Sequence, residues 1–154
     1  TGAFLDFVSQ AFDAEELMRV PTEDGSIGHA EIRVGDTVVL AFDRHADWSP
    51  VPSLLRVFVA DADKTFSQAV AAGGQGITPL ADDAFGQRGG RIKDPFGNIW
   101  WVISRVEDVP EEEMWRRLQV PVYAEAMRVA QETLDAELSG RGQGRSSAPV
   151  GTSG

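Results

Sequence analysis

The stretch Asp94-Pro95-Phe96-Gly97-Asn98-Ile99-Trp100 determines how the rest of this sequence is interpreted. Its first four residues have the composition of a β-turn, because proline presets one backbone dihedral and glycine tolerates conformations that other residues avoid. Residues 90–93 precede the turn and residues 99–104 follow it, each with the length of a short strand. The stretch therefore predicts a β-hairpin whose second strand carries two consecutive tryptophans.

The hairpin closes a longer unit that starts about 40 residues earlier. Residues 54–60 are apolar except for Arg56, which favours a strand. Asp61 is a good helix N-cap, because a short carboxylate accepts the free amide hydrogens of a first turn. The helix is expected to end at Gly73-Gly74, and residues 77–80 are expected to be extended. The order is strand, helix and three strands.

The first part of the chain repeats this unit. Residues 4–12 have helical spacing, residues 15–21 form a short run, and residues 28–42 predict a hairpin. Adding 62 to a residue number carries Gly28 to Gly90 and Gly35 to Gly97, so we infer an internal duplication. The opening strand of the first unit maps before Thr1 and is absent from the sequence. It is either removed, left out or replaced by another segment.

These patterns predict three regions. The first, residues 1–108, contains module one (1–43), a linker (44–53) and module two (54–108). The second, residues 109–138, is expected to form C-terminal helices, and the helix over 122–138 has an apolar stripe that needs a partner surface. The third, residues 139–154, is rich in glycine, serine, arginine and proline, which predicts a disordered tail.

Composition excludes several classes of function. The 154 residues contain no cysteine, so disulfides, thiolate metal sites and cysteine nucleophiles are excluded. A net charge of −10 argues against nucleic acid, which requires clustered lysine and arginine, and favours cationic or neutral partners. No apolar run is long enough to span a bilayer, and the first residues do not resemble a signal peptide. We therefore expect a cytoplasmic protein without a membrane partner.

Four stretches in this order resemble one family. They are Phe4-Leu5-Asp6-Phe7 with Ala11-Phe12, residues 28–36, residues 57–63, and above all the Asp94–Trp100 stretch. Together they resemble the vicinal-oxygen-chelate superfamily, also called glyoxalase/bleomycin-resistance/dioxygenase, over about residues 3–118. The resemblance implies an α+β fold with two βαβββ modules whose sheets curl around a cavity.

The resemblance also implies where metal ligands would lie. The position that usually supplies a glutamate in the metal enzymes is Trp101, and its repeat mate is Val39, or Leu40 if the register slips by one. The expected histidine falls near Leu54, and the remaining ligand would lie on the absent strand. Because none of these side chains offers a lone pair to a divalent ion, we expect no metal, no other cofactor and no metal-dependent catalysis.

The same substitutions predict an apolar binding site. Ile99, Trp101 and Ile103 share one face by strand alternation, and the resemblance turns this face inward. Trp101 would offer a stacking surface to an aromatic ligand or a cation, although it could equally fill the core of a module that binds nothing. Val39 and Leu54 are expected to line the same cavity, and Trp48 in the linker is a candidate for its lip.

A histidine and a glutamate form the second candidate pair. His29 and Glu31 are two residues apart on a predicted strand, so both side chains face the same side. They could bind the ligand at the rim of the site, or they could form an acid–base dyad, because a carboxylate raises the basicity of an imidazole. Both interpretations remain open.

These residues favour a binding protein over a catalyst. We expect a metal-free small-molecule-binding protein of the glyoxalase/bleomycin-resistance type, which sequesters an antibiotic or another natural product that is cationic or aromatic. The alternative is a glyoxalase-like lyase or isomerase, or a dioxygenase-type enzyme, acting on a small oxygenated substrate. A third hypothesis gives the C-terminal helix a role in assembly. The unpaired sheet edge also predicts a homodimer.

Overall fold

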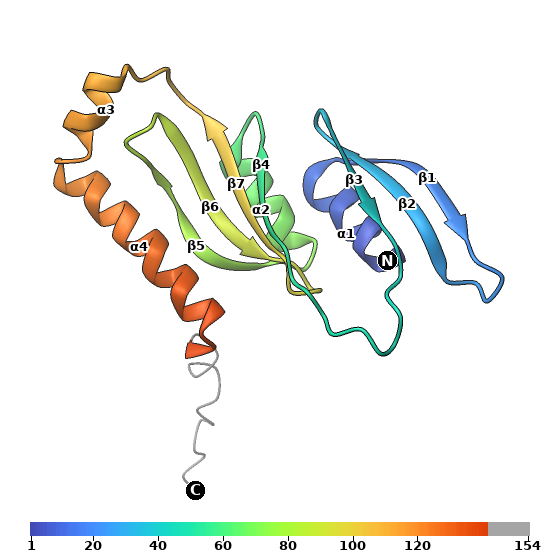
Figure 1. Cartoon of the computed structure of the whole chain (residues 1–154). Helices are drawn as coiled ribbons and strands as arrows, with labels where there is room; N and C mark the ends of the chain where they lie inside the picture. Colours follow the sequence, from blue (N-terminus) through green and yellow to red (C-terminus); the bar gives the residue numbers. More distant parts are fainter. Residues whose placement is uncertain (142–154) are drawn as a thin grey trace, which may run out of the picture.

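The computed structural model describes residues 1–141 and has an α+β fold with two separate sheets (Figure 1). The first sheet has the strand order β1-β2-β3, and the second has the order β4-β7-β6-β5. Of the predicted disordered tail, residues 142–154 lie outside the described residues. Among residues 1–141, no helix is both long enough and apolar enough to cross a membrane.

The first unit consists of one helix and an antiparallel three-stranded sheet. Helix α1 (Gly2–Phe12) is followed by β1 (Glu15–Pro21), β2 (Ile27–Val34) and β3 (Thr37–Ala41). Alternate residues of β2, among them Ala30 and Ile32, are fully buried on the side that α1 covers. The other face of this sheet carries no helix in the part of the chain that the structure describes.

The second unit has one strand more. Strand β4 (Leu54–Phe58) leads through α2 (Ala62–Ala71) to β5 (Gln75–Asp82), β6 (Gln87–Lys93) and β7 (Ile99–Arg105). Helix α2 forms a crossover between β4 and β5, and β7 later returns beside β4 and parallel to it. The hairpin pairs β5–β6 and β6–β7 are antiparallel. In residues 1–141, no strand beside β3 corresponds to β4 beside β7.

The duplicated units differ in the turn between their last two strands. Val34 pairs with Thr37 across a two-residue turn, whereas Lys93 pairs with Ile99 across five residues. The first turn is three residues shorter, so the pairing of β3 with β2 is shifted by three residues relative to the pairing of β7 with β6. As a result Val39 packs against the core on the helix side, and Leu40 lies on the open face with 62% of its surface exposed.

The two helices join the two units into one core. Gln68 Nε2 of α2 donates to Gln10 O of α1 at 2.7 Å, and the helices pack against each other. Trp100 is 3% exposed on the helix side of β7, where its ring lies 4.7 Å from that of Phe12. Its indole N–H donates to Asp94 Oδ2 at 3.0 Å. Trp100 therefore packs against α1.

The C-terminal region forms two helices, α3 (Glu111–Arg117) and α4 (Pro121–Leu138). Pro121 occupies the first turn of α4, where its missing N–H costs nothing. Helix α4 runs along β5 (Figure 1) and lies on the face of the second sheet opposite α2. Part of the apolar stripe of residues 122–138, including Ala126 and Val129, therefore faces the sheet of the same chain, whereas Val122 and Leu138 stay exposed.

Candidate functional site

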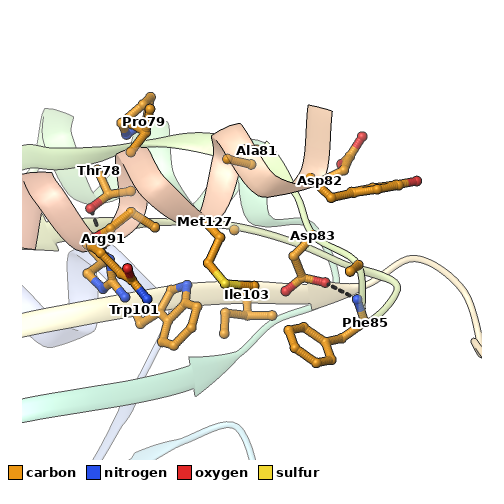
Figure 2. Close-up of a pocket in the computed structure, with 17 residues that line it drawn as sticks. Thr78, Pro79, Ala81, Asp82, Asp83, Phe85, Arg91, Trp101, Ile103 and Met127 are labelled. Atoms are coloured by element: carbon orange, nitrogen blue, oxygen red, sulfur yellow. Dashed lines mark hydrogen bonds between the residues drawn. The ribbon is translucent and has the colours of Figure 1, made fainter. Parts of the chain in front are cut away.

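A cavity of about 450 Å³ lies between the second sheet and helix α4. Its floor comes from β5, β6 and β7, its cover from α4, and one end from the loop between β5 and β6 (Figure 2). Most of its wall is apolar, which suits the body of a small organic molecule. The residues that line it are Thr78, Pro79, Ala81, Asp82, Asp83, Ala84, Phe85, Gly89, Arg91, Trp101, Ile103, Tyr123, Ala126, Met127, Val129, Ala130 and Gln131.

Strand alternation places the floor residues on one face. Arg91 of β6 pairs directly with Trp101 of β7, and Gly89 pairs with Ile103, so the side chains of Arg91, Trp101 and Ile103 point to the same side, which Gly89 also faces. Gly89 is required there, because an added Cβ would lie 2.6 Å from Val102 O and 3.3 Å from the indole nitrogen of Trp101. The glycine thus leaves room for the indole.

Arg91 is the buried charge of the site, with 9% of its surface exposed. Its Nη1 donates to Ala130 O at 2.6 Å and to Thr78 Oγ1 at 3.2 Å. Its guanidinium carbon lies 4.4 Å from the centre of the Trp101 ring. Burial lowers the pKa of Arg91 from its usual range, because a charge loses hydration there. The guanidinium still remains charged at neutral pH.

Two hydrogen-bonded hydroxyl groups link α4 to the sheet beside Arg91. Thr133 of α4 donates to Val129 O at 2.8 Å, so its oxygen accepts from Thr78 at 2.7 Å. Thr78 then accepts from Arg91, and each hydroxyl proton is used once. Lys93 Nζ and Glu137 Oε1, 2.5 Å apart, add a partly buried ion pair near the end of α4. These contacts hold the cover in place.

The opposite end of the cavity carries two carboxylates, and each of them contacts donors of the protein. Asp82 forms an ion pair with Arg88 at 3.2 Å. Asp83 Oδ1 accepts from the backbone N–H groups of Phe85 and Gln87 at 2.9 and 3.0 Å. Burial nevertheless raises the pKa of Asp83, since desolvation disfavours its charged form. Figure 2 shows Asp83 and Arg91 at separate ends, with Trp101, Ile103 and Met127 between them.

The structure brings together only part of the predicted site. Trp101 and Ile103 line the cavity, and Ile99 shares their face of β7 but lies outside the lining. Val39 lies instead on the helix side of β3, in a smaller cleft of about 180 Å³ between β3 and β4. Val39 does not share a wall with Trp101, because the three-residue shift in the pairing of β3, an odd number, turns Val39 away from the open face.

Two other predicted positions lie away from the cavity. Leu54 is exposed at the start of β4, beside Ile99. Trp48 is half-exposed in the linker, where its ring lies 4.7 Å from that of His45 and 6.3 Å from that of Phe42. Trp48 therefore forms a small aromatic cluster with the linker and not a lip of this cavity.

His29 and Glu31 lie on the open face of the first sheet. His29 Nε2 and Glu31 Oε1 are 3.0 Å apart, and both side chains are partly exposed. Neither lines the cavity under α4. In the repeat, His29 occupies the position 62 residues before Arg91, so equivalent positions of the two units carry different chemistry. Within residues 1–141, no three histidine or carboxylate side chains converge as metal ligands would.

Arg91, Thr78 and Asp83 were not anticipated from the sequence, nor was the contribution of Ala126 and Met127. A signal for Arg91 was available, because the predicted hairpin placed it on a strand beside Trp101. No such signal indicated that α4 lines the cavity, since an apolar helical stripe does not identify the surface on which the helix packs.

Comparison with known proteins agrees with this architecture. Residues 1–102 match the sequence model of the Glyoxalase/Bleomycin resistance protein/Dioxygenase superfamily. A Mycobacterium bovis protein, "Uncharacterized protein Mb0911c", is 36% identical over 121 residues, which cover 71% of this chain and 80% of that protein.

Solved structures show the same fold at lower sequence identity. TioX from Micromonospora sp. ML1 has a TM-score of 0.57 and 24% identity over 68% of this chain and 89% of that chain. The fosfomycin resistance protein FosX from Listeria monocytogenes has a TM-score of 0.53 and 13% identity over 74% of this chain and 88% of that chain. By sequence and by fold, this chain belongs to the glyoxalase/bleomycin resistance protein/dioxygenase superfamily.

Proposed function

We propose that this chain is a small-molecule-binding protein of the glyoxalase/bleomycin-resistance type and that it binds its ligand, without a metal, in the cavity under α4. The observation that carries this proposal is the mostly apolar cavity of about 450 Å³ into which one buried guanidinium is directed. Such a combination of apolar walls with few polar groups is typical of ligand sites.

The residues of the cavity support binding more than catalysis. Trp101, Ile103 and Met127 provide contact area, and burying apolar ligand surface contributes roughly 25 cal/mol per Å². Two polar groups of the wall are held by neighbouring groups, the Thr78 hydroxyl by Thr133 and Asp83 Oδ1 by backbone N–H groups. No histidine lines the cavity, although a histidine most often serves as general acid or base.

The ligand class that we propose is an antibiotic or another natural product. The fold likeness to FosX, which is described as a fosfomycin resistance protein, supports this class. At 13% identity the likeness concerns the fold, so the ligand itself has to be found by experiment.

A fluorescent-probe titration with a blocked cavity tests the proposal. N-phenyl-1-naphthylamine, an uncharged probe that brightens in apolar sites, is titrated into the intact protein and into Ala126→Trp, which fills the cavity from α4. Ala124→Trp is the matched control, because Ala124 is an exposed residue of the same helix. We expect the probe to bind the intact protein and Ala124→Trp, and to bind Ala126→Trp at least tenfold more weakly.

Absence of probe binding to the folded, intact protein would overturn the proposal, as would equal binding by the two tryptophan variants. If the cavity binds the probe, a panel of natural products that compete with it identifies the ligand class. A panel without a single competitor would remove the antibiotic assignment while leaving the binding site in place.

An enzymatic role is the second candidate, and one contact favours it. The 3.0 Å distance between His29 and Glu31 suits proton transfer on the open face of the first sheet. Metal analysis of the purified protein, together with the His29→Ala variant, tests this role. Stoichiometric bound metal that His29→Ala abolishes would favour the enzyme, and a metal content that is negligible in both proteins would count against a metal-dependent one.

We also propose that the chain forms a homodimer. The open face of the first sheet exposes four apolar side chains, Met18, Val20, Val38 and Leu40, and β3 pairs only with β2 among the described strands. Apolar patches and unpaired edges of this kind favour association with another chain. Sedimentation analysis of the protein across a concentration series measures the assembly.

A further inference from the structure

We infer that the cavity under α4 selects an organic acid, in which a carboxylate is bound by the free edge of Arg91 and an aromatic or alicyclic body lies against Ile103, Met127 and the part of Trp101 that lines the cavity. This inference rests on the proposed binding function and specifies the ligand class of the same site. It differs from the expectation based on net charge, which favours a cationic ligand.

The first argument is that Arg91 is buried without a counter-charge. The sequence contains 24 acidic residues, and the other arginines of β6, α3 and α4 all form ion pairs with carboxylates. No carboxylate oxygen among residues 1–141 lies within 4.0 Å of the Arg91 guanidinium. A buried charge is normally paired, because it has lost hydration that only an opposite charge or good hydrogen bonds replace. The missing charge is what an anionic ligand supplies.

The second argument concerns which atoms of Arg91 are free. Both hydrogens of Nη1 are used by Thr78 and Ala130, whereas Nε and Nη2 donate to no group of residues 1–141. No fully buried side-chain nitrogen in these residues lacks a partner, so Nε and Nη2 must retain access to open space. Arg91 lines the cavity, and these two atoms are therefore available to a ligand.

The free edge has the geometry that carboxylates prefer. Nε–H and Nη2–H point in parallel from one edge of the guanidinium and match the two oxygens of a carboxylate. The structure itself shows this use of the edge. In Arg19, Arg88, Arg116 and Arg128 the Nε and Nη2 atoms bind both oxygens of one carboxylate at 2.5–2.8 Å. Arg91 lines the cavity, and no group of residues 1–141 occupies the same edge of its guanidinium.

The third argument is that the acidic end of the cavity does not favour a cation. Asp82 is paired with Arg88, and Oδ1 of Asp83 accepts from two backbone N–H groups. Trp101, the best aromatic surface for a cation, lies between two arginines, with Arg91 at 4.4 Å and Arg56 at 4.9 Å from its ring centre. A cationic ligand would be repelled from the surface that it would otherwise occupy.

Two probes with the same rings and different charge test the inference. 8-Anilinonaphthalene-1-sulfonate is an anion, and N-phenyl-1-naphthylamine is its uncharged counterpart. Both are titrated into the intact protein, into Arg91→Met and into Arg56→Met. Arg56 is the matched control, because it contacts the same indole and does not line the cavity. We expect Arg91→Met to weaken the anionic probe about tenfold or more and the uncharged probe less than threefold.

The outcomes separate this inference from the proposed function. If neither probe binds the folded, intact protein, the binding function fails. If both bind but Arg91→Met and Arg56→Met weaken the anion equally, or if the cationic dye proflavine binds more tightly than the anion, the cavity remains and the acid selectivity is wrong. Arg91→Lys, which keeps the charge but loses the paired edge, is expected to bind the anion with intermediate affinity. If Arg91→Met does not fold, the affinity of Arg91→Lys for the anionic probe provides the test of acid selectivity.

Discussion

The two sheets are built from the same repeated unit, yet their open faces differ. In the second sheet, α4 covers the face and encloses a cavity with Arg91 and Trp101 on its floor. In the first sheet, the equivalent face carries His29, Glu31 and Leu40 and is covered by no helix of residues 1–141. The comparison shows that the sheet provides a surface, whereas the element packed on it decides whether that surface becomes a site.

The two hairpin turns also differ, in the number of hydrogen bonds that their aspartates accept. The turn of the second unit buries Asp94, whose carboxylate accepts hydrogen bonds from Phe96 N, Asn98 and the Trp100 indole at 2.8–3.0 Å. The turn of the first unit is short and exposed, and among the described residues Asp36 accepts a side-chain hydrogen bond only from the neighbouring Thr37 hydroxyl. The longer turn positions Trp100 between the two units and so stabilises the fold. The shorter turn connects β2 to β3.

The largest effect is expected from removing the residue that joins the two units. Trp100→Ala would leave a large cavity between β7 and α1 and a buried Asp94 with one donor fewer. We expect a loss of about 3–5 kcal/mol in the free energy of unfolding, measured by urea denaturation. Trp101→Ala, on the open face, should cost clearly less. Equal losses in the two variants would contradict the separate roles of the two faces.

The next effect concerns the cover of the second sheet. Thr133→Val keeps the shape of the side chain but removes the acceptor for Thr78, and we expect a loss of about 1–2 kcal/mol in unfolding free energy. Thr133→Ser keeps the hydroxyl and serves as the control. Amide hydrogen exchange in α4 is expected to become faster in the valine variant, and to change more than exchange in the first sheet. Unchanged exchange in α4 would mean that the threonine pair does not hold the helix.

A smaller effect is expected from the acidic end of the cavity. Because burial raises the pKa of Asp83 in the folded state, that state binds the proton more tightly, and stability falls as pH rises from about 4 through the raised pKa. Asp83→Asn keeps an acceptor oxygen for Phe85 and Gln87 and loses the titration. Urea denaturation at pH 4 and pH 7 measures this effect. The free energy of unfolding of the variant, relative to that of the intact protein, should be higher at pH 7 than at pH 4. A constant difference would show that Asp83 does not titrate there.

The smallest effect on stability is expected on the uncovered face. Leu40→Glu should change the unfolding free energy by less than about 0.5 kcal/mol, because the side chain is already exposed. In sedimentation it should shift the proposed homodimer toward monomer, since a buried carboxylate disfavours an apolar interface. Val51→Glu, at an exposed linker position, is the control. A dimer that tolerates Leu40→Glu must use another surface.

Most of the fold follows from local patterns. The Asp94 turn, the Asp61 cap and the 62-residue spacing predicted both units, and Asp61 indeed accepts from Lys64 N at 3.0 Å. The site was predicted less well. Strand alternation placed Trp101 and Ile103 correctly, because it depends on one strand alone. The 62-residue repeat placed Val39 on the face of Trp101, whereas the structure turns Val39 to the helix side, because the register of β3 depends on the length of the turn before it.

By itself, the sequence determined the elements, their duplication and the apolar character of the inward strand face. These features are set by neighbouring residues, through turn propensity, capping and side-chain periodicity. Only the tertiary structure decided that α4 covers the second sheet, that Arg91 is buried without a carboxylate, and that His29 lies elsewhere. Such facts depend on contacts between segments as far apart as Thr78 and Thr133, and an apolar stripe can pack on any surface of suitable shape.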